Sequence, residues 1–170
     1  MQAVKQLQTE RINSPIGTIL MVIDQDKLCA LDYLEYEARM IQLLTRRYGA
    51  FELTDSSTHS AISQQVTAYF AGDLQALDSI AVDTGGTAFQ QQVWSALRTI
   101  PTGATATYGQ LAARVGRPTA YRAVGMTNSL NPVAIVLPCH RVIGAKNALT
   151  GYAGGLARKE WLLRHEGVLF

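Results

Sequence analysis

A glycine-centred break, Asp83-Thr84-Gly85-Gly86, separates two parts of the chain that have different hydrophobic patterns. The chain begins with stretches in which apolar and polar residues alternate, which is typical of strands with one buried face. After the break, apolar residues recur every three or four positions, which is the spacing of helices. The break therefore predicts two domains, over residues 1–83 and 84–170, in a chain of 170 residues.

The first domain begins with three stretches of strand character. They cover residues 6–12, 18–23 and 28–34, and turn-forming residues separate them. Two segments with helical spacing follow and end at Gly49 and Gly72. We therefore expect a small N-terminal antiparallel sheet with helices, within an α/β (α+β) fold.

The second domain carries two capping boxes, Thr87-x-x-Gln90 and Thr107-x-x-Gln110, each of which marks the start of a helix. The second of these helices is followed by the tight turn Gly116-Arg117-Pro118 and by another helix from Thr119 to about Ser129. Helix, short glycine-containing turn and helix is the helix-turn-helix pattern, although ordinary helical hairpins share it. We expect a mostly helical C-terminal domain that contains a helix-turn-helix.

The formal net charge of +2 conceals an uneven distribution. Residues 1–86 hold six Lys and Arg against eleven Asp and Glu, whereas residues 87–170 hold nine against two. The halves therefore carry −5 and +7. A basic half indicates an anionic partner, of which nucleic acid is the commonest, and chance clustering is the alternative.

Several classes of protein are disfavoured by the sequence. No apolar run is long enough to cross a bilayer and we find no charged-then-apolar leader, so we expect no membrane partner and a cytoplasmic location. Cys29 and Cys139 are far apart, which argues against a disulfide framework and against a zinc site built on cysteine clusters. Cys29 lies in a strand-like stretch and is expected to be a small buried hydrophobe.

Cys139 lies in a different setting, at the end of the apolar stretch over residues 131–137. This stretch predicts a strand that delivers the thiol, followed at once by His140 and Arg141. A thiol becomes a good nucleophile when a base or a positive charge favours its thiolate, and these two neighbours can supply both. Adjacent side chains on extended backbone point opposite ways, so we expect a water between Cys139 and His140. A structural thiol at a strand end is the alternative.

The segment Pro138-Cys139-His140-Arg141-Val142 resembles the active-site signature of the O6-alkylguanine-DNA alkyltransferases, also called methylated-DNA–protein-cysteine methyltransferases. The resemblance covers the C-terminal half closely and the N-terminal half only in layout. The further motifs that carry it are Phe89-Gln90-x-x-Val93-Trp94, Tyr108-Gly109-Gln110-Leu111-Ala112, Arg122-Ala123-Val124-Gly125, Asn131-Pro132, Thr150-Gly151-Tyr152-Ala153-Gly154-Gly155 and Lys159-Glu160-Trp161-Leu162-Leu163-x-His165-Glu166-Gly167.

The resemblance implies a DNA repair protein of which each molecule repairs one lesion and is then inactive. It would transfer the alkyl group from O6 of guanine, and less readily from O4 of thymine, irreversibly to its own cysteine. By this likeness Cys139 is the acceptor, His140 is the base through a water, Glu166 orients and stabilises His140, and Asn131 holds the active-site turn by hydrogen bonds. No metal and no organic cofactor is implied.

The resemblance also assigns residues that face the DNA. Arg122 would fill the place of the damaged base after it flips out, and Tyr108 would crowd the 3′ phosphate and help to rotate the nucleotide. Small residues around Arg122 would permit a close approach to the minor groove. Tyr121 stands where many relatives carry a small residue, and we expect it to pack within its domain, DNA contact being the alternative. The remaining expected DNA contacts are Thr119, Ala123, Gly125 and Arg141.

The pocket for the flipped base is implied by the same likeness. Tyr152 would form its wall together with Tyr108, and the backbone carbonyls of Cys139 and Val142 would accept hydrogen bonds from the guanine amine. The backbone amide of Ala153 would donate to O6. The expected partner is double-stranded DNA that contains O6-alkylguanine; we expect a monomer in solution, and side-by-side binding of several copies on DNA stays open.

Three other functions fit parts of the pattern. An alkyltransferase-like damage sensor would flip the base without chemistry, but in that group the cysteine is replaced, so Cys139 argues against it. A helix-turn-helix regulator could use alkylation of Cys139 as a signal, but no regulatory domain is visible in the sequence. A cysteine hydrolase is disfavoured by the basic half and by the number of alkyltransferase-like motifs.

Overall fold

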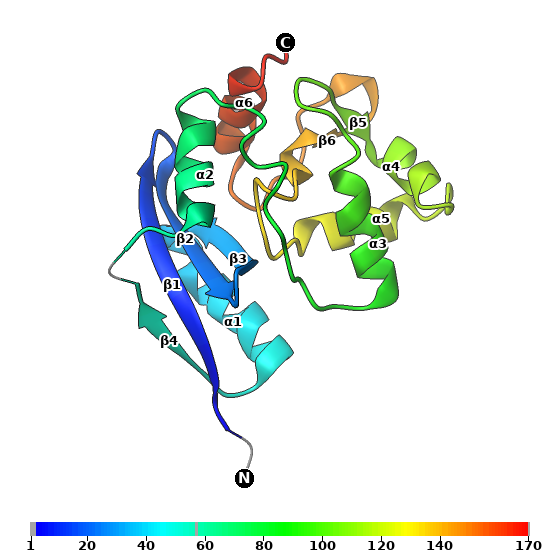
Figure 1. Cartoon of the computed structure of the whole chain (residues 1–170). Helices are drawn as coiled ribbons and strands as arrows, with labels where there is room; N and C mark the ends of the chain where they lie inside the picture. Colours follow the sequence, from blue (N-terminus) through cyan, green and yellow to red (C-terminus); the bar gives the residue numbers. More distant parts are fainter. Residues whose placement is uncertain (1–2, 57, 170) are drawn as a thin grey trace. The chain divides into compact units, whose positions relative to one another are not determined.

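The structure is a computed structural model that describes residues 3–56 and 58–169. The chain divides into two units, Met1–Gly85 and Gly86–Phe170, each with its own internal packing (Figure 1). The division falls inside the glycine-centred break.

A four-stranded sheet forms the centre of the first unit (Figure 1). Its strands lie in the order β3-β2-β1-β4, and the three N-terminal strands pair antiparallel as the sequence predicted. The last strand pairs parallel to β1 and was not predicted, so the sheet is mixed. The strands are β1 (Lys5–Ser14), β2 (Gly17–Asp24), β3 (Lys27–Tyr33) and β4 (Phe51–Asp55).

The hairpin between β2 and β3 shows why this meander forms. Asp24 pairs with Lys27, so only Gln25 and Asp26 lie in the loop. Both adopt positive φ angles, 48° and 69°, which a two-residue hairpin turn of the I′ type requires. That turn twists in the same sense as the strands that it joins.

Two helices cover the sheet of the first unit, α1 (Glu37–Tyr48) and α2 (Ala61–Phe70). The core on the α1 side contains Leu7, Leu20, Val22, Ala30, Met40 and Leu44, all buried. Helix α2 begins instead beside Glu10, whose carboxylate accepts a hydrogen bond from the Ser60 amide at 2.7 Å. Because Leu7 and Glu10 differ by an odd number of positions on β1, the two helices lie on opposite faces of the sheet.

The second unit is mostly helical, which confirms the predicted fold class. Both capping boxes form: the hydroxyls of Thr87 and Thr107 accept from the amides of Gln90 and Gln110, at 3.1 Å each. A short parallel pair accompanies the helices. The elements are α3 (Ala88–Leu97), β5 (Ala106–Thr107), α4 (Tyr108–Arg114), α5 (Tyr121–Ser129), β6 (Val142–Ile143) and α6 (Leu156–His165).

Helices α4 and α5 form the predicted helical pair, and α5 begins two residues later than the sequence suggested. Gly116 lies in the turn between them at a φ of 75°, in the region that favours glycine. Trp94 on α3 donates its indole N–H to the carbonyl oxygen of Thr127 at 3.0 Å and so ties α3 to α5. In the described part of the chain, no helix combines the length and the apolar character needed to span a bilayer.

Candidate active site

The segment before Cys139 is a compact turn, so the strand predicted over residues 131–137 is wrong. Ile135 adopts a φ of 71°, which interrupts any extended run. Cys139 itself lies in a single 3-10 turn over Cys139–Arg141. The apolar residues of the segment are buried because the turn is enclosed by its unit, and a buried apolar run alone does not distinguish the two conformations.

Asn131 holds this turn together with its side chain. Its Nδ2 donates to the carbonyl oxygen of Leu137 at 2.7 Å, and its Oδ1 accepts from the amide of Val133 at 2.9 Å. One side chain therefore spans the turn that leads to Cys139. This is the hydrogen bonding that the resemblance implied for Asn131.

A chain of three buried groups follows the thiol. Cys139 is 5% exposed and His140 is 0% exposed. Nε2 of His140 lies 2.8 Å from Oε2 of Glu166. Arg141 donates to the same carboxylate through Nε at 2.7 Å and through Nη2 at 3.1 Å. Glu166, 26 positions after His140, therefore serves two neighbours of the thiol at once.

The charges of Glu166 and Arg141 determine the protonation state and the tautomer of His140. Burial alone raises the pKa of Glu166, but His140 and Arg141 outweigh it and hold that pKa well below its ordinary value. Burial lowers the pKa of His140, and Glu166 opposes this only in part. The carboxylate is thus ionised and can only accept, so the neutral imidazole carries its proton on Nε2. Nδ1 is left as an acceptor, the form that a general base needs.

Arg141 does not have the position that we expected for a DNA contact. Its side chain also donates to the carbonyl oxygen of Ile100 at 2.8 Å and to Oγ1 of Thr102 at 3.3 Å, and the residue is only 7% exposed. Its burial and its internal partners do not favour the expected DNA contact. The guanidinium neutralises Glu166 and ties it to the segment that follows α3.

Lys159 is a site residue that sequence reasoning missed as a functional group. Its ammonium is buried and donates to the carbonyl oxygens of Val142 at 2.5 Å, Thr150 at 2.6 Å and Gly151 at 3.0 Å. Burial lowers its pKa to about 8, and the charge of Cys139 opposes the shift. Lys159 therefore joins the strand after the thiol to the loop before Tyr152.

A signal for Lys159 was present in the sequence. Lys159, Leu162, Leu163 and Glu166 follow the i, i+3, i+4, i+7 spacing of one helix face, and all four are buried. A lysine and a glutamate on an otherwise apolar face need partners inside the fold. The same spacing points to both ends of α6 as parts of the site.

Tyr108 is the first residue of α4. A Cβ atom placed on Gly151 would lie 3.3 Å from its hydroxyl, and one placed on Gly125 would lie 3.6 Å from its ring. Burial raises the pKa of Tyr108, a hydrogen bond with Thr150 opposes this, and the charge of Cys139 raises the pKa further. The ring thus lies between α5 and the loop around Gly151, close to Cys139.

The other residues expected to line the pocket are placed as follows. Tyr152 and Ala153 are half-buried, and both precede α6. The carbonyl oxygen of Val142 accepts from Lys159, as described above, and that of Cys139 accepts from Nδ2 of Asn128 at 3.5 Å. The carbonyl oxygen of Cys139 also accepts from the backbone amide of Val142.

The outer surface of α5 is exposed. Arg122, Ala123 and the preceding Thr119 are exposed, and Gly125 is half-buried against Tyr108. Tyr121 is 49% exposed, so the prediction that it packs within its domain is wrong. Its ring lies beside Arg122, with 5.9 Å between the guanidinium carbon and the ring centroid.

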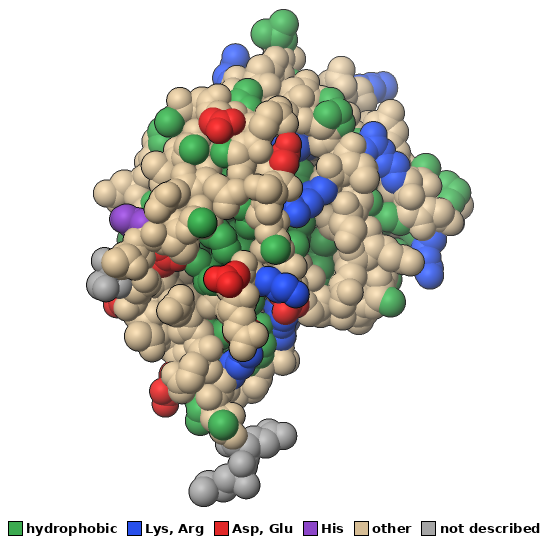
Figure 2. All heavy atoms as spheres, viewed as in Figure 1, with side chains coloured by type: hydrophobic (Ala, Val, Ile, Leu, Met, Phe, Trp, Pro, Cys, Tyr) green, Lys and Arg blue, Asp and Glu red, His purple; other side chains and the backbone are tan. Residues whose placement is uncertain are grey.

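The helix-turn-helix surface is basic and free of acidic residues. No Asp or Glu occurs between Asp83 and Glu160 in the sequence. In Figure 2, blue Lys and Arg side chains and green hydrophobic ones are visible over the region of α4 and α5. Such a surface suits an anionic partner.

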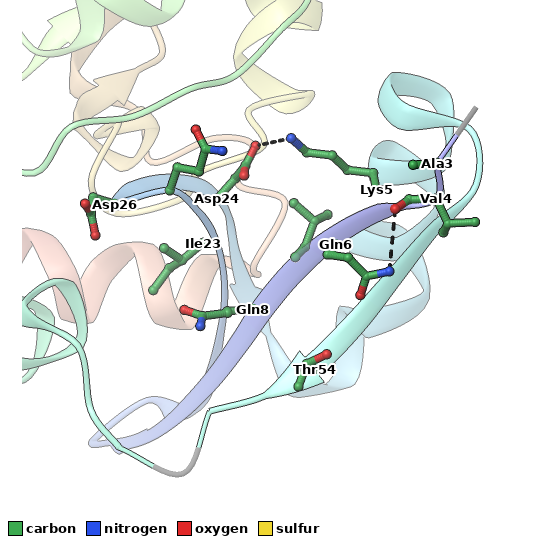
Figure 3. Close-up of a pocket in the computed structure, with 11 residues that line it drawn as sticks. Ala3, Val4, Lys5, Gln6, Gln8, Ile23, Asp24, Asp26 and Thr54 are labelled. Carbon is green, nitrogen blue, oxygen red and sulfur yellow. Dashed lines mark hydrogen bonds and ion pairs between the residues drawn. The ribbon is translucent and has the colours of Figure 1, made fainter. Parts of the chain in front are cut away.

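A hollow of about 750 Å³ lies elsewhere, at one end of the sheet in the first unit (Figure 3). Lys5 and Asp24 line it and form an ion pair at 2.8 Å. It contains none of the predicted site residues, all of which belong to the second unit. Within residues 3–56 and 58–169, no group of three or more His, Cys, Asp or Glu side chains could hold a metal ion.

Comparisons with known proteins agree with this geometry. The family model of the 6-O-methylguanine DNA methyltransferase DNA binding domain matches residues 88–168, and that of its ribonuclease-like domain matches residues 9–84. A methylated-DNA–protein-cysteine methyltransferase from Salmonella typhimurium is 49% identical over 167 residues, 96% of this chain and 98% of the relative. One from Methanosarcina acetivorans is 43% identical over 159 residues, 91% and 94% of the two chains.

Solved structures show the same fold. The crystal structure of Mycobacterium tuberculosis OGT in complex with DNA has a TM-score of 0.80 and 42% identity and covers 94% of this chain and 92% of its own. That of O6-methylguanine-DNA methyltransferase from Pyrococcus kodakaraensis has a TM-score of 0.74 and 25% identity, with 95% and 99% covered.

Proposed function

This chain belongs to the 6-O-methylguanine DNA methyltransferase family, and from that premise we propose that it is a DNA repair enzyme that moves the alkyl group of O6-alkylguanine in duplex DNA to the sulfur of Cys139. The observation that carries the proposal is the buried thiol followed by the chain His140–Glu166–Arg141. This chain supplies a neutral base, a carboxylate that fixes its tautomer and a cation that keeps the carboxylate ionised.

The reaction that we propose is a direct displacement. The proton of the Cys139 thiol passes through a water to Nδ1 of His140, and Glu166 stabilises the imidazolium that forms. The thiolate attacks the alkyl carbon, the bond from that carbon to O6 breaks, and its electron pair stays on the guanine. The amide of Ala153 stabilises O6. The released anion takes up one proton from solvent while the His140 imidazolium gives its proton back to solvent, which restores guanine and the neutral imidazole.

Each molecule reacts once in this proposal. The product is a thioether, whose carbon has no good leaving group, so no later step returns the free thiol. O4-alkylthymine presents the same kind of carbon–oxygen bond and is the slower second substrate.

The burial of the thiol implies that the base leaves the helical stack. Cys139 is 5% exposed, so a base inside a duplex does not reach its sulfur. We propose that α5 enters the minor groove, that Arg122 occupies the place of the flipped nucleotide, and that Tyr108 borders the base and its 3′ phosphate. The protein would do this as a monomer.

Intact-mass measurement after incubation with duplex DNA carrying O6-methylguanine tests the proposal. We expect one added methyl group, located on Cys139, with a limit of one per protein molecule. The Cys29→Ala variant should react in the same way, because that thiol is in the other unit, and Cys139→Ser should gain nothing. Turnover beyond one equivalent, or a methyl group on Cys29, would contradict the mechanism.

A further inference from the structure

Two buried polar atoms in the second unit have no hydrogen-bond partner among the described residues. They are Nδ1 of His140, in a residue that is 0% exposed, and Oδ1 of Asn128, in a residue that is 6% exposed. Buried polar groups are commonly satisfied by ordered water where protein groups do not reach them.

Both atoms belong to side chains that adjoin residue Cys139. His140 follows Cys139 directly in the 3-10 turn. Asn128 lies in the last turn of α5, and its Nδ2 points at the carbonyl oxygen of Cys139, at 3.5 Å. This contact assigns the amide nitrogen to the carbonyl and leaves Oδ1 as the second, unpaired end of the same side chain.

The two atoms are also of the same chemical kind. Nδ1 of His140 is an acceptor because Nε2 carries the proton toward Glu166, and an amide oxygen is always an acceptor. A water has two hydrogens and can satisfy both acceptors at once. Its lone pairs then remain for the S–H group of Cys139, which gives the water three protein partners, a usual number for buried water.

We propose that Asn128 is a positioning residue, whose Oδ1 and Nδ1 of His140 together hold the water that carries the proton from Cys139. The inference rests on the proposed function and adds a residue to it. When the thiol transfers its proton to this water, the water passes one of its own to Nδ1. Charge and protons balance, and Asn128 keeps the water in place without exchanging a proton.

The test uses Asn128→Leu, which has nearly the same shape and removes both ends of the amide. Replacing a polar side chain by an apolar one of the same shape costs little stability when no partner is left unpaired, and the carbonyl oxygen of Cys139 keeps its hydrogen bond from the amide of Val142. Ser129→Ala, on the next and exposed residue of α5, is the matched control. The measurement is the rate of methyl transfer from free O6-methylguanine base to Cys139, per mole of folded protein, across pH.

We expect Asn128→Leu to react about tenfold more slowly at neutral pH, with its pH profile moved to higher pH by about one unit, because the thiolate forms less readily. Ser129→Ala should match the wild type. If Asn128 only supports the fold, Asn128→Leu will melt at a lower temperature while the pH profile of its folded fraction stays in place, and the inference is then wrong.

Asn128→Ala gives a second reading if the leucine variant does not fold, and iodoacetamide labelling of Cys139 across pH replaces the methyl donor. The same alkaline shift of the labelling profile supports the inference, and an unmoved profile overturns it. Wild-type protein that gains no methyl group would instead contradict the proposed function. The two failures are therefore distinguishable.

Discussion

Glu166 shows how one residue can decide the state of its neighbours. Its carboxylate receives Arg141 and His140 together in a site with almost no solvent. Removal of one partner from a buried ion pair leaves the other charge uncompensated, which costs about 3–5 kcal/mol. The proton of His140 lies on Nε2 because this carboxylate accepts its hydrogen bond. The same side chain therefore serves both stability and the chemistry of the base.

The pKa shifts of this pair predict how stability depends on pH. The native pKa of His140 lies below its ordinary value of 6.5, and that of Glu166 lies below 4.5. Between the native pKa and the ordinary pKa of each group, the unfolded chain binds more protons than the native chain. The free energy of unfolding therefore rises with pH in that range. On acidification, stability should fall from about pH 6.5 because of His140, and further below about pH 4.5 because of Glu166.

Urea unfolding between about pH 3 and pH 7 measures this effect, and Glu166→Gln separates the two residues. This variant should lose about 3–5 kcal/mol at pH 7 and should show a flatter profile below about pH 4.5. Glu160→Gln is the control, because Glu160 is an exposed partner of Arg164 on the same helix. A Glu166→Gln profile parallel to that of the wild type would refute the shift.

At the scale of single residues, a dense motif pointed to Cys139, His140 and Asn131, and the structure places these residues in one site. It did not predict where Arg141 points, because adjacency along the chain does not say whether a guanidinium faces solvent or a carboxylate 25 positions away. Lys159 was missed as a functional group although its spacing on α6 gave a signal. A buried charged residue on an apolar helix face indicates a polar site inside the fold.

Among the elements, α5 combines properties that suit a minor-groove helix. Ala123 and Gly125 are small, whereas Tyr121 and Met126, which are 49% and 68% exposed, flank Arg122. Residues four apart lie on one helix face, so Met126 is one turn from Arg122. Apolar side chains beside an arginine are a common means of opening a base step in the minor groove.

Replacement of Arg122 by alanine tests this element. We expect Arg122→Ala to slow repair of O6-methylguanine in duplex DNA by at least about tenfold, because the energy that holds the flipped state is lost. Transfer from the free base should change by less than about twofold, since Cys139 and His140 are untouched. Single-turnover kinetics with both substrates provides the measurement.

Arg164→Ala, on α6 and outside the helix-turn-helix, is the matched control and should leave both rates unchanged. Equal slowing of both reactions in Arg122→Ala would show that this residue acts on the chemical step and not on the base.

Local chemistry explains which elements were predictable. Helix starts at Ala88 and Tyr108 were predicted correctly because a capping box is a contact between neighbours in sequence. The strand β4 was missed because its pairing joins Phe51 to Lys5, and no local pattern specifies so distant a partner. The turn over residues 131–137 was misread as a strand because its buried apolar run carries no periodicity of its own.

At the scale of the whole chain, the structure shows which basic side chains of the second unit have internal partners. The second unit contains nine Lys and Arg residues. Arg141 and Lys159 are buried with internal partners, and Arg164 is paired with Glu160. The other six basic side chains of this unit set an upper limit on its charge contacts with DNA: Arg98, Arg114, Arg117, Arg122, Lys146 and Arg158.

This count predicts the salt dependence of DNA binding. Each neutralised phosphate releases counterions and contributes about −0.9 to the slope of log Kobs against log salt, so six contacts set a limit of about −5. Arg117→Ala, in the exposed turn between α4 and α5, should make the slope shallower by about one unit. Fluorescence anisotropy with an undamaged duplex over a salt series measures it. Lys27→Ala, at the start of β3 in the first unit, should leave the slope unchanged. A slope well beyond −5, or an equal effect of Lys27→Ala, would mean that the DNA also contacts the acidic half.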